Sequence, residues 1–197
     1  MDLFSKEEAD VMGEISNICM GSSATSLNVM LNQPVNITTP SVHLVHKNEL
    51  LSDYEKSCVI IKVQYTEGLI GNNLLVLKDA DAKIITDLMM GGDGHGKYSE
   101  GDMTDLHISA VSEAMNQMTA SAATAMSKLF DHKIDISPPS VKSVVIEDFE
   151  VADDFTDDMF VKINFKMTIG SLIDSTMVQL YPYDLAHSIY QLFQRRK

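Results

Sequence analysis

The stretch DVMGEISN at residues 10–17 returns in altered form as SAVSEAMN at residues 109–116. Both belong to a longer match, because residues 10–42 align with residues 109–141 without a gap at a shift of 99 positions. The C-terminal parts of the two halves also align, at a shift of 103. The chain is therefore a tandem duplication of a unit of roughly 100 residues, with an insertion in the middle of one half.

Both halves predict the same order of elements: a long helix, three strands and a second helix. In the first long helix the apolar residues Val11, Ile15 and Ile18 recur at helical spacing, and we expect them to face the core. Gly68 and Gly170 mark hairpin turns. The helices are expected at 6–31, 79–90, 103–130 and 183–194. The strand-like runs lie at 40–46, 57–65, 69–77, 140–146, 160–167 and 171–180.

These elements predict an α+β fold with pseudo-two-fold symmetry. Two α-β-β-β-α units are expected to share one six-stranded antiparallel sheet, with helices packed on it and the two long helices exposed on one face. The whole chain, 1–197, is expected to be a single domain made of two repeats, about 1–90 and 103–197. The Gly-rich, charged linker 91–102 is expected to be flexible and exposed.

The composition excludes several classes of function. The net charge of −13 disfavours nucleic acid and anionic membrane surfaces as partners. The chain has no long apolar run and no signal-peptide pattern, so we expect a cytoplasmic protein without direct membrane insertion. Cys19 and Cys58 are isolated and are expected to be small buried side chains rather than a disulfide or metal ligands.

Three weaker patterns are given structural interpretations. Gly91-x4-Gly96-Lys97 imitates a phosphate-binding loop, but Tyr98 follows where a Ser or Thr would hold magnesium. His43 and His46 would lie on opposite faces of a strand, which is poor geometry for one metal ion. The acidic run 147–158 is expected to be a solvated loop. We therefore predict no cofactor or metal site of the chain's own.

The repeated Glu and Asn are the candidate functional residues. On the first helix Asp10, Glu14 and Asn17 form a narrow stripe beside the core positions, so the stripe should face outward. Such a stripe alone would be expected on any solvated helix face. Its duplication as Glu113 and Asn116 is informative, because most other surface positions differ between the two copies.

A proline follows each pair at the same distance. Pro40 after Asn17, and Pro139 after Asn116, each come after 22 intervening residues. The resulting pattern, [Asp/Ser]-x3-Glu-x2-Asn-x22-Pro, is met twice. It resembles the motif of the CheC/FliY/CheX family, phosphatases that act on the chemotaxis response regulator CheY. The stretch GEISNICMGSSATSLNVMLNQPVNITTPSV (13–42) looks especially like the phosphatase domain of FliY members, which belong to the flagellar motor switch.

The resemblance covers essentially the whole chain and implies two active sites. It implies hydrolysis of the aspartyl phosphate on CheY, with Asn17 and Asn116 orienting the attacking water. Glu14 and Glu113 would pair with a lysine beside the phosphorylated aspartate. The response regulator would supply the Mg²⁺, and this chain would hold no cofactor.

Four further residues complete the motif as supporting residues. Asp10 and Ser109 are expected to cap or support the same surface. Pro40 and Pro139 are expected to shape the turn after each helix, without a catalytic role.

Two other functions stay open. The helices could form a non-catalytic binding module for phosphorylated CheY or for the receptor deamidase CheD. Alternatively, the chain could be a structural component of the switch, peripheral at the flagellar basal body. We expect an excised FliY domain rather than a free-standing CheC-type protein. The intact Asn in both copies favours catalysis, because a docking surface needs no amide that orients water.

Overall fold

The computed structural model describes residues 4–54, 56–149, 155 and 157–196, and half of the acidic run 147–158 lies outside these residues. The helices are α1 (Lys6–Leu31), α2 (Asp79–Met89), α3 (Asp105–Phe130) and α4 (Tyr183–Arg195). The strands are β1 (Val35–His46), β2 (Ser57–Glu67), β3 (Gly71–Lys78), β4 (Asp135–Ile136), β5 (Ser140–Val145), β6 (Met159–Ile169) and β7 (Ile173–Pro182). Short 3₁₀ turns are η1 (Lys47–Glu49), η2 (Lys97–Ser99) and η3 (Ile146–Asp148).

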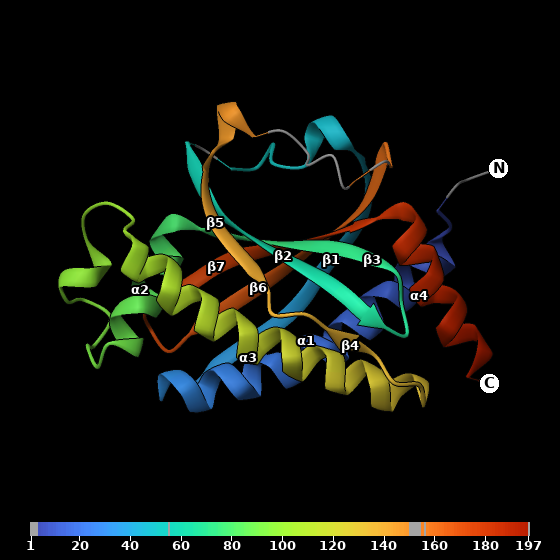
Figure 1. Ribbon diagram of the computed structural model, residues 1–197, viewed down its shortest axis with the longest axis horizontal. Helices are drawn as coiled ribbons and strands as arrows, with labels where there is room; N and C mark the ends of the chain where they lie inside the picture. Colours follow the sequence, from blue (N-terminus) through green and yellow to red (C-terminus); the bar gives the residue numbers. More distant parts are fainter. Residues whose placement is uncertain (1–3, 55, 150–154, 156, 197) are drawn as a thin grey trace.

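One antiparallel sheet contains all the described strands, in the order β1-β6-β7-β3-β2, with β4 and β5 both paired to the outer edge of β2. The two halves meet at the centre of the sheet, where β3 pairs β7. The edges are exchanged: β1 of the first half pairs β6 of the second, and β4 and β5 of the second half pair β2 of the first. Each half therefore completes the sheet of the other (Figure 1). The predicted α+β class and the shared sheet are confirmed.

The sheet has seven strands rather than the expected six, because prolines divide one of them. In the first half β1 runs on through Pro40, with a register shift between Thr38 and Ser41. In the second half Pro138 and Pro139 separate β4 from β5. Proline has no N–H to donate to a ladder, so two in succession interrupt the pairing. Both motif prolines thus lie where the strand after a long helix is irregular.

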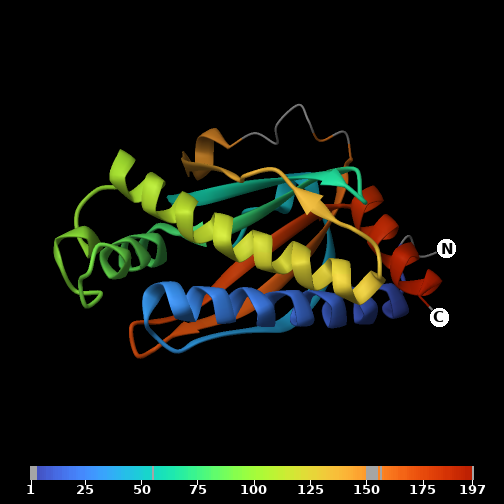
Figure 2. The ribbon, with the colours of Figure 1, turned by 60° about the horizontal axis from the view of Figure 1, so that its bottom comes forward.

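The two long helices lie antiparallel on one face of the sheet, and the main core is between them and the sheet (Figure 2). The core side of α1 includes Met12, Ile15 and Leu27, each about 1% exposed. Ile18 was expected in the core but is 42% exposed. It lies one turn after Glu14 on the helix and so shares the outward face with it. A smaller cluster covers the other face of the sheet, where Leu50 and Tyr54 contact strand residues.

The hairpin turns lock the two halves together. Gly68 and Gly170 both have positive φ, of 86° and 50°. A Cβ on Gly68 would lie 2.2 Å from the carbonyl oxygen of Lys133, just after α3. The N–H of Gly170 donates to the carbonyl of Pro34, just after α1. Each turn therefore contacts the segment that follows the other half's long helix.

The linker between the halves was expected to be flexible, but a buried carboxylate anchors it. Asp87 on α2 is 2% exposed and accepts hydrogen bonds from the backbone N–H groups of Gly94 (2.8 Å) and Gly96 (3.1 Å). A Cβ on Gly96 would lie 2.5 Å from this carboxylate. The glycines therefore serve close packing around Asp87, which the composition alone could not reveal.

Among the described helices, none combines the length and the apolar character that spanning a bilayer requires. Cys19 and Cys58 are both buried free thiols, 5% and 0% exposed, as the sequence predicts.

Candidate active sites on the two long helices

The first motif lies on the outward face of α1. Asp10, Glu14 and Asn17 are all exposed, while the intervening Met12 and Ile15 are buried. Ser5 caps the helix, since its side chain accepts the N–H of Glu8. Asp10 is a full turn further on, so of its two expected roles, capping the helix or supporting the motif surface, capping is excluded. Its carboxylate instead lies on the exposed face with Glu14 and Asn17.

The second motif repeats this arrangement on α3 with small differences. Ser109 and Glu113 are exposed, whereas Asn116 is half-buried. Thr104 caps this helix, in a reciprocal arrangement with His107, so Ser109 is not a cap either. The first motif therefore carries an additional carboxylate, Asp10, where the second has a hydroxyl.

Small residues let the two helices approach closely at the point where they cross. The hydroxyl of Ser23 donates to the carbonyl of Met118 at 2.8 Å, and the hydroxyls of Ser26 and Ser121 share a hydrogen bond. Ser22 donates to the carbonyl of Ser121, its own counterpart in the second half, at 3.4 Å. The pseudo-two-fold axis therefore passes near this contact.

The crossing sets the separation of the two motifs. Asn17 and Asn116 each lie five residues before the crossing pair, Ser22 and Ser121. Since an α-helix rises 1.5 Å per residue, each Asn is about 7–8 Å from the crossing along its helix. The helices are antiparallel (Figures 1 and 2), so the two Asn residues lie on opposite sides of the axis. The fold thus presents the two motifs as separate candidate sites on one helical layer.

An open groove of about 490 Å³ lies beside the first motif, between α1 and β1. Its walls include Asp10, Gly13, Glu14 and Asn17 from the helix, and Val42 from the strand. The polar side chains of the motif therefore border a hollow wide enough to receive part of another molecule.

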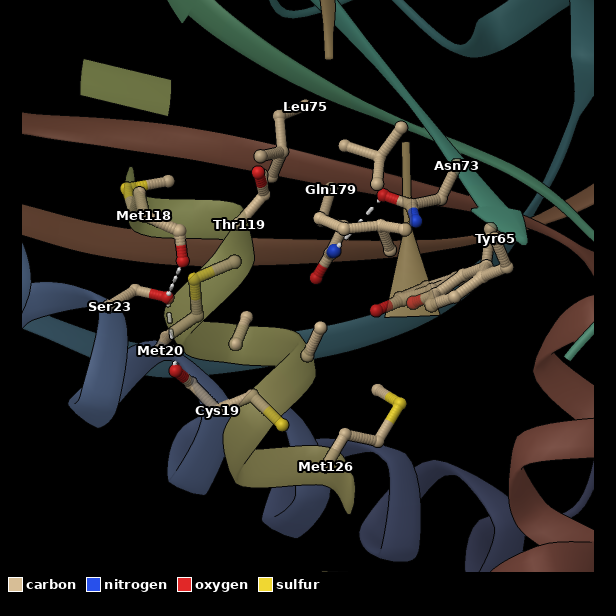
Figure 3. Close-up of a pocket in the computed structure, with 15 residues that line it drawn as sticks. Cys19, Met20, Ser23, Tyr65, Asn73, Leu75, Met118, Thr119, Met126 and Gln179 are labelled. Atoms are coloured by element: carbon tan, nitrogen blue, oxygen red, sulfur yellow. Dashed lines mark hydrogen bonds between the residues drawn. The ribbon is translucent and has the colours of Figure 1, made fainter. Parts of the chain in front are cut away.

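A second cavity, of about 30 Å³, lies beneath the helix crossing and does not reach either motif. Figure 3 shows Gln179 donating to Asn73 across it, at 3.2 Å, and Ser23 directed at Met118. Burial raises the pKa of Cys19, which also lines it, to about 12. Because that thiol is protonated at neutral pH, it supplies no nucleophile, and we assign the cavity to core packing.

No group of three His, Cys, Asp or Glu side chains in the described part of the chain is placed to hold a metal ion. His43 is exposed, and His46 instead accepts the N–H of Asn48 through Nδ1. The residues gathered at each motif are a carboxylate and a carboxamide, which can make hydrogen bonds and ion pairs with an incoming partner.

Comparisons with known proteins find relatives that share both the motif helices and the fold. A model of the CheC-like family matches residues 7–44 and 106–143, which include all but the first residue of each motif helix and the proline after it. The crystal structure of Thermotoga maritima FliY is 38% identical, with a TM-score of 0.91, over 98% of this chain and 99% of that one. The chain belongs to the CheC-like family. Within the CheC-like family, the flagellar motor switch phosphatase FliY of Bacillus subtilis (strain 168) is 48% identical over 190 residues.

That match covers 96% of this CheC-like chain but 50% of the Bacillus relative, so the chain spans about half of that protein's length. The middle domain of FliM from H. pylori has the same fold, with a TM-score of 0.74 at 15% identity over 95% of this chain and 99% of that one.

The structure adds residues to the CheC-like site that sequence reasoning passed over. Gly13 and Val42 line the groove beside Glu14 and Asn17. Gly13 could have been noticed, because glycine is unfavourable inside a helix unless something requires it. Val42 had no such signal, because its position against α1 depends on how β1 packs.

Proposed function

We propose that this chain is a phosphatase that hydrolyses the aspartyl phosphate of the response regulator CheY at the flagellar motor switch. The observation that carries the proposal is the presence of two Glu–Asn pairs on equivalent helices of one face, in a chain of the CheC-like family. Both Glu residues and Asn17 are exposed, and Asn116 is half-buried. The name of the Bacillus subtilis relative, a flagellar motor switch phosphatase, supports it.

The proposed reaction transfers the phosphoryl group to water. The oxygen of the water attacks phosphorus in line, the bond from phosphorus to the aspartyl oxygen breaks, and the products are inorganic phosphate and a free aspartate. An aspartyl phosphate is an acyl phosphate and already reactive, so orienting the water supplies most of the catalysis. A positioned amide contributing about a hundredfold lowers the barrier by about 2.7 kcal/mol.

Asn17 and Asn116 are the proposed water-orienting residues. A carboxamide can both accept from and donate to the water, and it brings no negative charge next to the phosphoryl oxygens. The exposure of Asn17 beside an open groove supports this role, because the phosphoryl group must come close to the amide. No covalent intermediate on this chain is needed.

Glu14 and Glu113 are the proposed docking residues. Each lies one turn before its Asn and is exposed, so it can pair with a lysine beside the phosphorylated aspartate of the partner. Mg²⁺ bound by the partner would screen the phosphoryl oxygens, and this chain would hold no ion of its own. Asp10 adds negative charge at the first site.

The proposed place of action is the motor switch, in contact with phosphorylated CheY and switch proteins. The main alternative is a binding module for phosphorylated CheY or CheD, or a structural part of the switch. That alternative shares the exposed Glu residues but needs no water-orienting Asn.

Loss of phosphate from magnesium-loaded phospho-CheY tests the proposal. Asn17→Ala and Asn116→Ala should each retain part of the activity, and the double variant should lose about a hundredfold. Asn28→Ala is the matched control, because Asn28 is exposed on α1 but lies three turns from the motif; it should behave as wild type. A double variant as active as wild type would refute the catalytic assignment. Binding without faster dephosphorylation in wild type would favour the binding module.

A further inference from the structure

Two glycines flank the candidate water-orienting residue of the first site. Gly13 and Gly21 lie four residues before and after Asn17, in the interior of α1. Residues four apart are neighbours on a helix surface, so both positions adjoin Asn17 along the helix. After proline, glycine is the least favourable residue in a helix interior. The presence of two glycines in this helix interior therefore needs an explanation.

The fold itself supplies no such reason. Neither glycine is among the residues with positive φ in the described chain. A Cβ on Gly21 would meet nothing within 4 Å, and one on Gly13 would lie 3.5 Å from Cγ2 of Val42, an ordinary contact. The second half has Ser112 and Ala120 at the corresponding positions of α3. Larger side chains are thus compatible with the same helix in the same fold.

The surroundings of the two amides differ. Asn17, between two glycines, is exposed, whereas Asn116, between Ser112 and Ala120, is half-buried. Gly13 also forms part of the groove wall beside Glu14 and Asn17. The backbone therefore carries no side chain on either side of Asn17, and we call this bare surface at Gly13 and Gly21 the notch.

We propose that Gly13 and Gly21 provide the steric clearance through which the phosphorylated surface of the partner reaches Asn17, which makes the first site the more open of the two. The inference rests on the proposed function. A water held between an amide and a phosphorus atom spans two hydrogen-bond-like distances, so the loops around the phosphorylated aspartate must approach the helix surface closely. Side chains one turn above and below the amide would obstruct that approach.

The test separates stability from activity, because the proposal predicts opposite signs for the two. In the Asn116→Ala background, where only the first site operates, Gly13→Ala and Gly21→Ala should each raise the Tm by about 3 °C through better helix propensity. Together they should lower kcat/KM for phospho-CheY about threefold, and Gly21→Leu should lower it at least about tenfold, as a steric penalty predicts. The loss should be mainly a rise in KM.

The second site provides the reciprocal experiment. In the Asn17→Ala background, Ser112→Gly with Ala120→Gly should lower the Tm by a similar amount and raise kcat/KM about threefold. Asn28→Ala is again the control, since it improves helix propensity far from the notch and should raise the Tm without changing kcat/KM.

The outcomes distinguish failure of the proposed function from failure of the clearance role. If Asn116→Ala alone is no more active than the Asn17→Ala, Asn116→Ala double variant, the proposed function of the first site fails, whatever the glycines do. If Asn116→Ala is active, and the glycine substitutions raise the Tm while kcat/KM is unchanged, the clearance role is refuted.

Discussion

Substitution of Gly68 by alanine tests how tightly the two halves are interlocked. Gly68 has a φ of 86°, and a Cβ there would lie 2.2 Å from the backbone oxygen of Lys133. Gly91 is a matched control, because its φ is 88° and its Cβ would meet nothing within 4 Å. Gly170 is the counterpart of Gly68, but its Cβ would meet only the side chain of Gln33, which can move aside.

These contacts give the expected magnitudes. Placing an alanine in the left-handed region costs about 1–2 kcal/mol, and this cost is common to Gly68→Ala and Gly91→Ala. Only Gly68→Ala also forces backbone against backbone, which adds about 1–3 kcal/mol of overpacking. Gly68→Ala should therefore lower the free energy of unfolding by about 2–5 kcal/mol. Gly170→Ala should lie close to Gly91→Ala.

Urea unfolding followed by far-ultraviolet circular dichroism measures all three variants, because the chain contains no tryptophan. The linear extrapolation then gives the free energy of unfolding for each. A cost for Gly68→Ala no larger than that for Gly91→Ala would contradict the reasoning, since the close approach to Lys133 would then contribute nothing.

Two further predictions concern buried groups. Asp87→Asn removes the negative charge of the group that accepts hydrogen bonds from the N–H groups of Gly94 and Gly96. It should lower the free energy of unfolding by about 1–3 kcal/mol and speed hydrogen exchange at those two amides. Unchanged exchange would contradict the anchoring role. Burial raises the pKa of Cys19 and of Cys58 to about 12, with the charge of Asp79 adding to the rise for Cys58. A thiol in the unfolded chain has a pKa of about 8.5. Protonation of the buried thiols therefore contributes fully to the free energy of unfolding below that pH, and the contribution is lost as the pH rises toward 12. Neither thiol should therefore react with Ellman's reagent at pH 8 until urea unfolds the chain, and rapid reaction of the native protein would refute this.

The sequence predicted the elements well because the chain contains each of them twice. The alignment of the two halves located the four helices within two residues of their observed bounds. The turn glycines Gly68 and Gly170 were recognisable from their context. The strand residues before the motif prolines were missed, at the start of β1 and in β4, because Pro40 and Pro139 were expected to shape a turn between each long helix and the next strand.

Features that depend on tertiary packing were harder to predict. Ile18 matches the helical repeat, but α1 is rotated so that it is exposed while Ile15 is buried. The anchoring of the linker depends on Asp87, which looks like any other acidic helix residue until its burial is known. The exposure of Glu14 and Asn17 followed from the stripe they form. Their catalytic roles stay predictions, since orientation of a water needs the partner.

The exchange of edge strands explains why duplication and fusion suit this fold. A chain corresponding to one half would have no partner of its own for its first strand, since β1 pairs β6 and β5 pairs β2. Two such chains could complete the sheet only by forming a homodimer, which would dissociate on dilution. Covalent connection through residues 91–102 replaces this association by an intramolecular step at an effective concentration of order millimolar. The complete sheet, and with it both Asn17 and Asn116 on one helical layer, is then retained however low the concentration of the protein.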